Sequence, residues 1–258
     1  MTTFKTAFDL FKDKLPKIGF QVPSIDSMLC GGLRLRGITE IAGEAGSGKS
    51  QLAMNLCLTT QLPLEMGGIG TKSLYISTEG PLATERLLRM ARTLIEKHEL
   101  NVTATQMMDN VIYISVMEYD DLYNLIVNRL ERLLETEPVG LVIIDSIAAI
   151  FRIEERYAER SQDLRSLVVT LQHLGKKYDF ATVCINQVRN DLESEEVGPT
   201  LGLSWANLVT TRLQIYKQPS MKQGDTVLRQ KRVLRVIWAP NLRKNDEATF
   251  YINENGIL

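Results

Sequence analysis

The stretch Gly43-Glu-Ala-Gly-Ser-Gly-Lys-Ser50 fits the pattern G-x-x-x-x-G-K-[ST] at every position. Residues 37–42 before it are typical of a strand, and residues 49–61 after it are typical of a helix. The glycines let the backbone curl so that successive N–H groups point inward, and the following helix adds its positive dipole end. The stretch therefore predicts a loop that binds phosphate groups.

Two residues of the loop are expected to contact the phosphates and the metal ion of a bound nucleotide. Lys49 should reach the β- and γ-phosphates of ATP, and the Ser50 hydroxyl should ligate Mg²⁺. The alternative is a glycine-rich turn that binds nothing, which the full match and the strand–loop–helix context disfavour. The expected nucleotide-binding residues are Gly43, Glu44, Ala45, Gly46, Ser47, Gly48, Lys49, Ser50 and Gln51.

The rest of the chain predicts an α/β fold. Four more apolar strands are expected at residues 72–77, 111–116, 139–144 and 181–185, and the helices between them at 82–98, 119–134 and 163–177. Such alternation indicates a mostly parallel central sheet with helices on both faces. Three later strands, without helices between them, are expected to extend the sheet in antiparallel fashion, at 209–216, 233–239 and 249–252.

Composition narrows the classes of function. The chain has 258 residues and a formal net charge of -1, so any nucleic-acid contact must come from local basic patches. No apolar run approaches the roughly 20 residues that span a bilayer, and we expect no membrane partner. Cys30, Cys57 and Cys184 lack metal-type spacing, and we expect buried free thiols in a reducing compartment.

Polar residues follow three of the expected strands at one edge of the sheet. Asp145 ends strand 139–144 and fits a Mg²⁺-side carboxylate, an assignment favoured over a simple cap by the nearby glycine loop. Glu79 follows strand 72–77 and could hold an attacking water, but an acid at a helix N-terminus is an equal alternative. Gln187 ends strand 181–185, where the residues alone favour a polar strand cap over a γ-phosphate sensor.

Several motifs in the same order resemble the RecA/RadA recombinase family, and the resemblance covers essentially the whole chain. They are Gly43 to Ser50, Tyr75-Ile-Ser-Thr-Glu-Gly80, Ile144-Asp-Ser146 and Asn186-Gln-Val188. More narrowly, Leu201-Gly-Leu-Ser-Trp-Ala-Asn207 and the tail from Ile237-Trp-Ala-Pro240 resemble a eukaryotic paralogue group of that family, X-ray repair cross-complementing group three.

The resemblance implies a RecA-like P-loop ATPase core at residues 17–258. It makes Glu79 the catalytic glutamate, acting with Lys49, and Gln187 the phosphate sensor. It implies that the Arg86 guanidinium stacks on adenine and that Pro240 covers the adenine of a neighbouring subunit's ATP.

The resemblance also places two DNA-binding loops. The first carries Arg152, Arg156 and Arg160, although a solvated, charged helix start is an equal alternative there. The second carries Arg189 but is otherwise acidic, which suits single-stranded DNA poorly. Asn207 stands where the family usually has a histidine that couples ATP to DNA, which weakens the case for strand exchange by this chain alone.

The first residues resemble an oligomerisation motif of the family. Phe4 and Ala7 match its F-x-x-A pattern, so residues 1–16 are expected to be an oligomerisation and linker segment, without a separate N-terminal helical domain. A short amphipathic helix packed on its own domain is the alternative. The implied partners are a related paralogue subunit and single-stranded DNA, and a recombinase filament could be a third. The implied location is the nucleus, and the chain could also occur in the cytoplasm.

These inferences lead to two main hypotheses. The first is a DNA-dependent ATPase of low turnover that acts in homologous-recombination DNA repair, inside a hetero-oligomer on single-stranded DNA. The second is a structural subunit that needs bound nucleotide for assembly and performs little chemistry. A small-molecule kinase is disfavoured, because no arginine-rich lid segment stands out.

Overall fold

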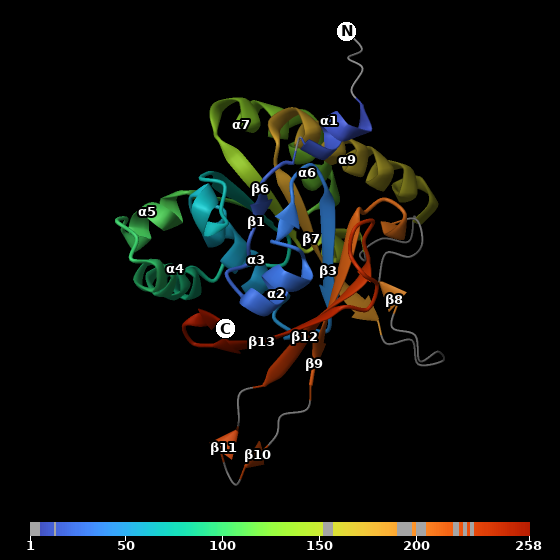
Figure 1. Cartoon of the computed structure of the whole chain (residues 1–258). Coiled ribbons are helices and arrows are strands. Elements are labelled where there is room, and N and C mark those ends of the chain that lie inside the picture. The colour runs from blue at the N-terminus through green and yellow to red at the C-terminus, as the bar shows by residue number, and fades with distance from the viewer. Residues whose placement is uncertain are drawn as a thin grey trace.

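The centre of the molecule is one ten-stranded sheet, in the order β14-β13-β12-β9-β3-β7-β6-β4-β5, with β8 (Gly198–Pro199) beside β7 (Figure 1). The structure is a computed structural model that describes residues 6–12, 14–151, 157–189, 198–199, 205–218, 222–223, 226–227 and 230–258. The chain is therefore an α/β protein, as the sequence predicts.

Six neighbouring strands of the sheet are parallel: β5 (Val111–Ser115), β4 (Lys72–Ser77), β6 (Val139–Asp145), β7 (Ala181–Arg189), β3 (Ile38–Gly43) and β9 (Thr211–Lys217). The antiparallel extension consists of β12 (Lys231–Trp238), β13 (Glu247–Asn253) and β14 (Gly256–Ile257).

The prediction that the strand at 209–216 is antiparallel was wrong, because β9 runs parallel to β3. Thr210 fixes this direction at the first residues of both strands. Its N–H donates to the Ile38 carbonyl at 2.9 Å, and its Oγ1 accepts from the Ile38 N–H at 2.9 Å. The chain thus returns to the starting end of the sheet before β9 begins, and the antiparallel part begins one strand later.

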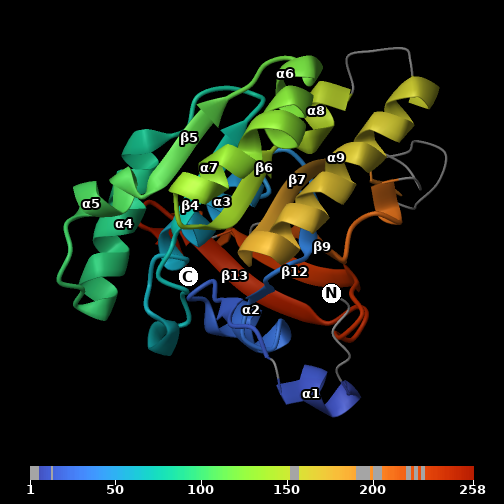
Figure 2. The same ribbon diagram turned by 90° about the horizontal axis from the view of Figure 1, so that it is seen from above.

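Helices cover both faces of the sheet (Figure 2). One face carries α2 (Pro23–Met28), α3 (Lys49–Thr59), α4 (Thr84–His98) and α5 (Ala104–Asp109). The other carries α6 (Tyr119–Asn124), the π-helical η2 (Leu125–Arg129), α7 (Leu130–Thr136) and α9 (Tyr157–Tyr178). The helix expected at 119–134 is therefore one helical run that contains a π-helical segment.

Shorter elements complete the described fold. They are α1 (Ala7–Lys12), β1 (Lys17–Ile18), β2 (Leu33–Arg34), η1 (Leu64–Met66), α8 (Ile147–Phe151), β10 (Lys222–Gln223) and β11 (Thr226–Val227). The α1 helix begins with a reciprocal cap, in which the Asp9 N–H donates to Thr6 Oγ1 at 3.1 Å and the Thr6 N–H donates to Asp9 Oδ2 at 3.0 Å.

Strand β6 shows how the sheet divides the core into two layers. All seven of its residues are buried. Leu141 and Ile143 pack with α3 and α4, whereas Val142 and Ile144 pack with α7 and α9. Because side chains alternate between the faces of a strand, one continuous apolar run fills both layers.

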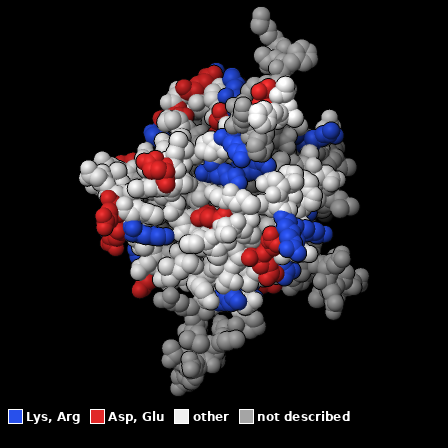
Figure 3. Space-filling model, in the orientation of Figure 1, with Lys and Arg blue, Asp and Glu red and all other residues white. Residues whose placement is uncertain are grey.

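The charges on the surface are mixed. On the face seen in Figure 3, small groups of Lys and Arg side chains are interspersed with Asp and Glu, which agrees with the net charge of -1 (Figure 3). Within the described ranges, no helix has both the length and the apolar character that crossing a membrane requires.

The cysteines differ from the expectation in one respect. All three are free thiols, and Cys57 and Cys184 are buried, but Cys30 is exposed. Cys30 adopts φ 54° in the turn after α2, at the surface of the molecule.

We predict that a thiol reagent modifies only Cys30 in the native protein near neutral pH. Burial excludes the reagent from the other two and raises the pKa of Cys57 to about 12 and that of Cys184 as well. Mass spectrometry of the labelled peptides checks this, with the Cys30→Ser variant as the control that stays unlabelled. Rapid native labelling of Cys57 would contradict the packing of α3 on the sheet.

Candidate functional site

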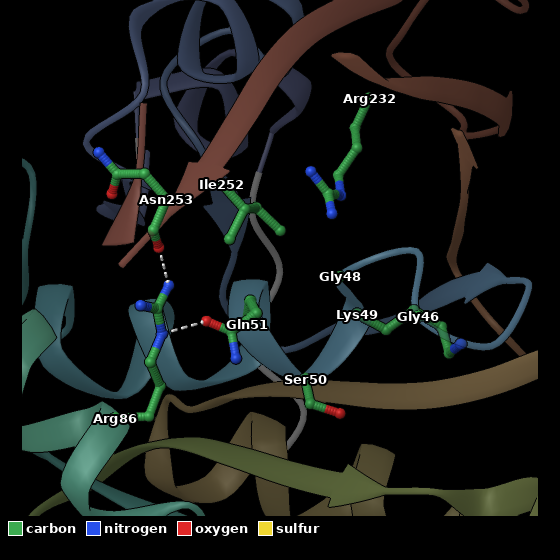
Figure 4. A pocket seen from close by; sticks show the side chains of 9 residues that line it. All are labelled: Gly46, Gly48, Lys49, Ser50, Gln51, Arg86, Arg232, Ile252 and Asn253. Atoms are coloured by element: carbon green, nitrogen blue, oxygen red, sulfur yellow. Dashed lines mark hydrogen bonds between the residues drawn. The ribbon is translucent and has the colours of Figure 1, made fainter. Parts of the chain in front are cut away.

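Two cavities flank the first turn of α3. The first, of about 460 Å³, is lined by Gly46, Gly48, Lys49, Ser50, Gln51, Arg86, Arg232, Ile252 and Asn253 (Figure 4). The second, of about 330 Å³, is lined by Ser50, Gln51, Met54, Tyr75, Ser77, Glu79, Gly80, Pro81, Leu82, Ala83 and Asp145. Both have the size of small-ligand pockets, and Ser50 and Gln51 belong to both.

Two loop positions must be glycine. Gly48 has φ +106°, and a Cβ there would lie 2.4 Å from Ile252 Cδ1. A Cβ at Gly43 would lie 2.7 Å from Ser47 Oγ and 2.9 Å from the Ile215 carbonyl oxygen. The loop can therefore lie against the C-terminal strands only because these residues lack side chains.

Basic side chains hold the carbonyl groups of the loop. Lys49 is buried, and its Nζ donates to the carbonyl oxygens of Gly43 and Glu44, both at 2.9 Å. Lys217 Nζ donates to the Ala45 carbonyl at 3.0 Å, and Arg232 Nε donates to the Ser47 carbonyl at 3.0 Å. These contacts orient the loop and gather positive charge beside it.

Polar groups of the loop remain for a ligand. The N–H groups in the first turn of α3 have no acceptor within the helix, as at any helix start, and favour an anion. The Ser47 hydroxyl is buried and has no hydrogen-bond partner among the described residues. No described atom lies within 4 Å of where a Cβ on Gly46 would stand, so the loop has open space there. The donor set and this space fit a phosphate group.

Asp145 forms the wall of the second cavity, at the end of β6. Tyr75 Oη donates to its Oδ2 at 2.5 Å, and Ser50 also hydrogen-bonds to it. The pKa of Asp145 is raised, mainly because burial disfavours the charged carboxylate and also because of the nearby charge of Glu79. The hydrogen bonds from Ser50 and Tyr75 and the charge of Lys49 lower the pKa but do not cancel this effect. The expected pair Ser50 and Asp145 thus lies together beside the loop.

This pair fits Mg²⁺ better than a metal held by protein alone. In the described part of the chain, no group of three or more His, Cys, Asp or Glu could hold a metal ion. Mg²⁺ commonly takes one or two protein oxygens and completes its shell with water and phosphate oxygens. Ser50 Oγ and the Asp145 carboxylate could supply the protein oxygens.

Glu79 and Gln187 lie in contact with each other. Glu79 Oε1 accepts hydrogen bonds from Ser146 Oγ at 2.6 Å and from Gln187 Nε2 at 3.0 Å. Helix α4 begins at Thr84, and the acid in its first turn is Glu85, so Glu79 does not lie in the first turn of that helix. The structure therefore brings together the two residues expected to sense the γ-phosphate and to hold water.

Arg86 joins three elements at the first cavity. Its Nε donates to Gln51 Oε1 at 2.7 Å, one Nη to the Asn253 carbonyl at 2.5 Å and the other Nη to the Glu254 carbonyl (Figure 4). A guanidinium held at three points has a fixed plane, which stacking on a base requires.

Some residues of the site were missed in the sequence. Arg232 is one of several basic residues around the C-terminal strands, and such a charged group is usually a solvated strand face. The period of the strand could have separated it, because Leu234 and Val236 on the same face of β12 pack in the core beside α3. The roles of Tyr75, Ser146 and Asn253 in the site could not be predicted from the local sequence, because each contacts a residue far away in the chain.

The remaining predicted residues lie away from the two cavities or outside the described residues. Pro240 is exposed and lines neither cavity. It follows the C-terminal end of β12, whereas Arg232 lies at the N-terminal end of that strand. Ala7 is exposed at the start of α1. Phe4, Arg152 and Arg156 lie outside the described residues, and for Arg160 in α9 and Arg189 in β7 only the backbone is described.

A strand, a glycine loop and a helix, with a carboxylate at the end of a nearby parallel strand, define the P-loop class of α/β protein. Comparison with known families agrees with this class. Residues 13–258 match the Rad51 family model. The chain belongs to the Rad51 family.

Three relatives illustrate the similarity. The chain is 32% identical over 264 residues to the DNA repair protein rhp57 of Schizosaccharomyces pombe, covering 86% of this chain and 73% of that protein. It is 32% identical over 266 residues to the meiotic recombination protein DMC1 homolog B of Oryza sativa subsp. japonica, covering 99% of this chain and 72% of that protein. It is 33% identical over 244 residues to DMC1 homolog A of Oryza sativa subsp. indica, covering 91% and 66%.

We predict that Asp145→Asn raises the thermal stability of the nucleotide-free protein at pH 7. Because the pKa of Asp145 is raised in the fold, this carboxyl contributes most stability when protonated, and the contribution is lost as the pH rises above the ordinary value of 3.8. Asparagine is neutral at every pH and avoids the cost of a buried charge.

The melting temperature, measured from pH 4 to pH 8, checks this. The gain should be largest at the alkaline end and shrink toward pH 4. The exposed Asp109→Asn is the control, and should change the free energy of unfolding by no more than about 0.5 kcal/mol. A lower melting temperature for Asp145→Asn at pH 7 would contradict the buried, charged carboxylate.

Proposed function

We propose that the chain binds ATP with Mg²⁺ in the two cavities beside α3 and hydrolyses it slowly, as a recombinase paralogue in homologous-recombination DNA repair. The observation that carries the proposal is the convergence of Lys49, Ser50, Asp145 and Glu79 on the first turn of one helix. The names of the relatives, a DNA repair protein and a meiotic recombination protein, support this biological setting.

The cavities assign each part of the nucleotide to a place. The phosphates would lie on the N–H groups of Gly46 and of Gly48 to Ser50, with Lys49 at the β- and γ-phosphates. The adenine would lie in the first cavity, against Arg86 and beside Ile252. When bound at Ser50 and Asp145, Mg²⁺ would neutralise charge on the phosphates.

Glu79 is the residue we propose to orient the attacking water. Ser146 and Gln187 hold one of its carboxylate oxygens, and the residue lines the second cavity. Its other oxygen could accept a hydrogen bond or a proton from water placed there. Gln187, in contact with Glu79, would then respond to the γ-phosphate.

A second candidate is a structural subunit that needs nucleotide for assembly. Two sequence features favour it: Asn207, and the acidic run Asp191, Glu193, Glu195 and Glu196, which lies outside the described residues. An acidic segment repels the phosphates of DNA. The measured turnover with and without single-stranded DNA separates the two candidates.

We propose a hetero-oligomer for either role. Residues 1–16 would form the oligomerisation segment, with Phe4 and Ala7 entering pockets of a related paralogue, and residues 17–258 the ATPase core. Pro240 lines neither cavity of its own chain, which suits a cover for a neighbour's adenine. Residues 201–207 and the C-terminal tail suggest the X-ray repair cross-complementing group three, and a nuclear location.

We predict that Lys49→Ala lowers the affinity for MgATP by at least about a hundredfold, or about 2.7 kcal/mol. The change removes a charge-assisted hydrogen-bond donor from the phosphates. Titration with a fluorescent ATP analogue checks this. Lys72→Ala is the control, because Lys72 pairs with Glu137 and lines neither cavity. Unchanged affinity in Lys49→Ala would remove the loop as the binding site.

We predict that Glu79→Gln keeps the affinity for ATP and lowers its turnover at least about a hundredfold, the lower range for general-base catalysis. The amide can still accept the bonds from Ser146 and Gln187 but cannot take a proton. Steady-state phosphate release checks this, with the exposed Glu85→Gln as control. Equal turnover in Glu79→Gln and in the unmodified protein would exclude Glu79 from the reaction.

A further inference from the structure

A buried acid lies in the middle of the strand that leads into the phosphate loop. The Glu40 side chain in β3 is 1% exposed and accepts three hydrogen bonds from three different segments. The donors are Asn186 Nδ2 at 2.6 Å, Trp205 Nε1 at 2.7 Å and Arg212 Nε at 2.7 Å. Neither cavity includes Glu40 in its lining, so its contacts are entirely with the protein.

Two of these donors bracket one stretch of chain. Asn186 lies in β7, and Trp205 lies between β8 and β9. Both donate to the same oxygen of Glu40, Oε1. One carboxylate oxygen thus joins β7 to Trp205, which precedes β9.

Glu40 is connected to the nucleotide site in two ways, along the backbone of β3 and through hydrogen bonds in β7. Gly43 of the phosphate loop follows Glu40 by three residues in β3. Next to Asn186 in β7 is Gln187, whose N–H donates to Asn186 Oδ1 at 2.8 Å and whose Nε2 contacts Glu79 at 3.0 Å. A shift that reaches the Gln187 backbone would therefore move the N–H that the Asn186 side chain accepts.

The charge of Glu40 makes this arrangement sensitive to geometry. Arg212, opposite it in register in β9, forms the ion pair, and its side chain is 17% exposed. A buried ion pair recovers the cost of desolvation only when its hydrogen bonds are well placed. Lengthening any of the three bonds therefore costs more than it would at the surface.

We propose that Glu40 is a positioning residue that makes the placement of Trp205 depend on the nucleotide at the phosphate loop. The inference rests on the proposed binding of ATP. A shift of Gln187 at the γ-phosphate displaces Asn186, Glu40 Oε1 follows its donor, and the indole N–H of Trp205 moves with their shared acceptor. Trp205 thereby responds to ATP without touching it.

Trp205 supplies its own spectroscopic readout. The chain has two tryptophans, and the other, Trp238, is 49% exposed and lines neither cavity. In a Trp238→Phe parent, Trp205 is the only indole, and its emission reports the surroundings of the buried N–H. We expect MgATP to change this emission with the same concentration dependence as direct nucleotide binding.

Asn186→Ala in the Trp238→Phe parent is the decisive variant, because it leaves the Glu40–Arg212 ion pair and the Trp205 contact in place. It should bind a fluorescent ATP analogue within about threefold of the parent and lose the Trp205 emission change. Glu40→Gln should do the same. Asn110→Ala, which removes an amide bonded to Gln61 at 3.3 Å, is the control that should keep the response.

The outcomes separate this inference from the proposed function. A parent that binds ATP without a Trp205 emission change overturns the inference alone, as does a full response in Asn186→Ala. A parent that binds no ATP overturns the proposed function and this inference with it. Should Glu40→Gln fail to fold, Asn186→Ala decides by itself.

Discussion

The close packing of the turn from β3 into α3 positions the other residues of the site. Gly43 and Gly48 have no room for a side chain, since Ser47, Ile215 and Ile252 occupy that space. Lys49, Lys217 and Arg232 then hold the carbonyl groups of the loop from three elements. With those carbonyls engaged, the N–H groups at the start of α3 remain for an anion, and every other proposed contact is placed relative to them.

Local sequence predicted the parallel strands, the main helices and the loop, because hydrophobic period and glycine spacing are properties of short segments. The direction of β9 could not be predicted, because Thr210 fixes it through bonds to Ile38, 172 residues away in sequence. For the same reason the sequence identified Glu79 and Gln187 as candidates but could not show that they touch. Glu40 is the extreme case, since its three partners lie 146 to 172 residues further along the chain.

Residues at the two ends of strand β12 are proposed to contact two different ATP molecules, one in the chain's own site and one in a neighbouring subunit. Arg232 at one end contacts the chain's own phosphate loop, whereas Pro240 lies beyond the other end and lines neither cavity. One strand could therefore serve a nucleotide in its own subunit and cover a nucleotide in a neighbour. Glu40, with its donors Asn186 and Trp205, joins the strand that leads into the phosphate loop to the segment before β9. On this account ATP organises contacts within and between subunits as well as undergoing hydrolysis.

In the proposed complex, the base of ATP lies in the first cavity, against the Arg86 guanidinium and beside Ile252. Photolabelling with 8-azido-ATP and Mg²⁺, followed by peptide mapping, tests it most directly, because the reactive group sits on the purine. We expect label on the peptides that carry Arg86 or Ile252 to Asn255, and loss of the label when excess ATP is added. ATP-sensitive label confined to other peptides, such as those of α5 or α7, would contradict this placement of the base.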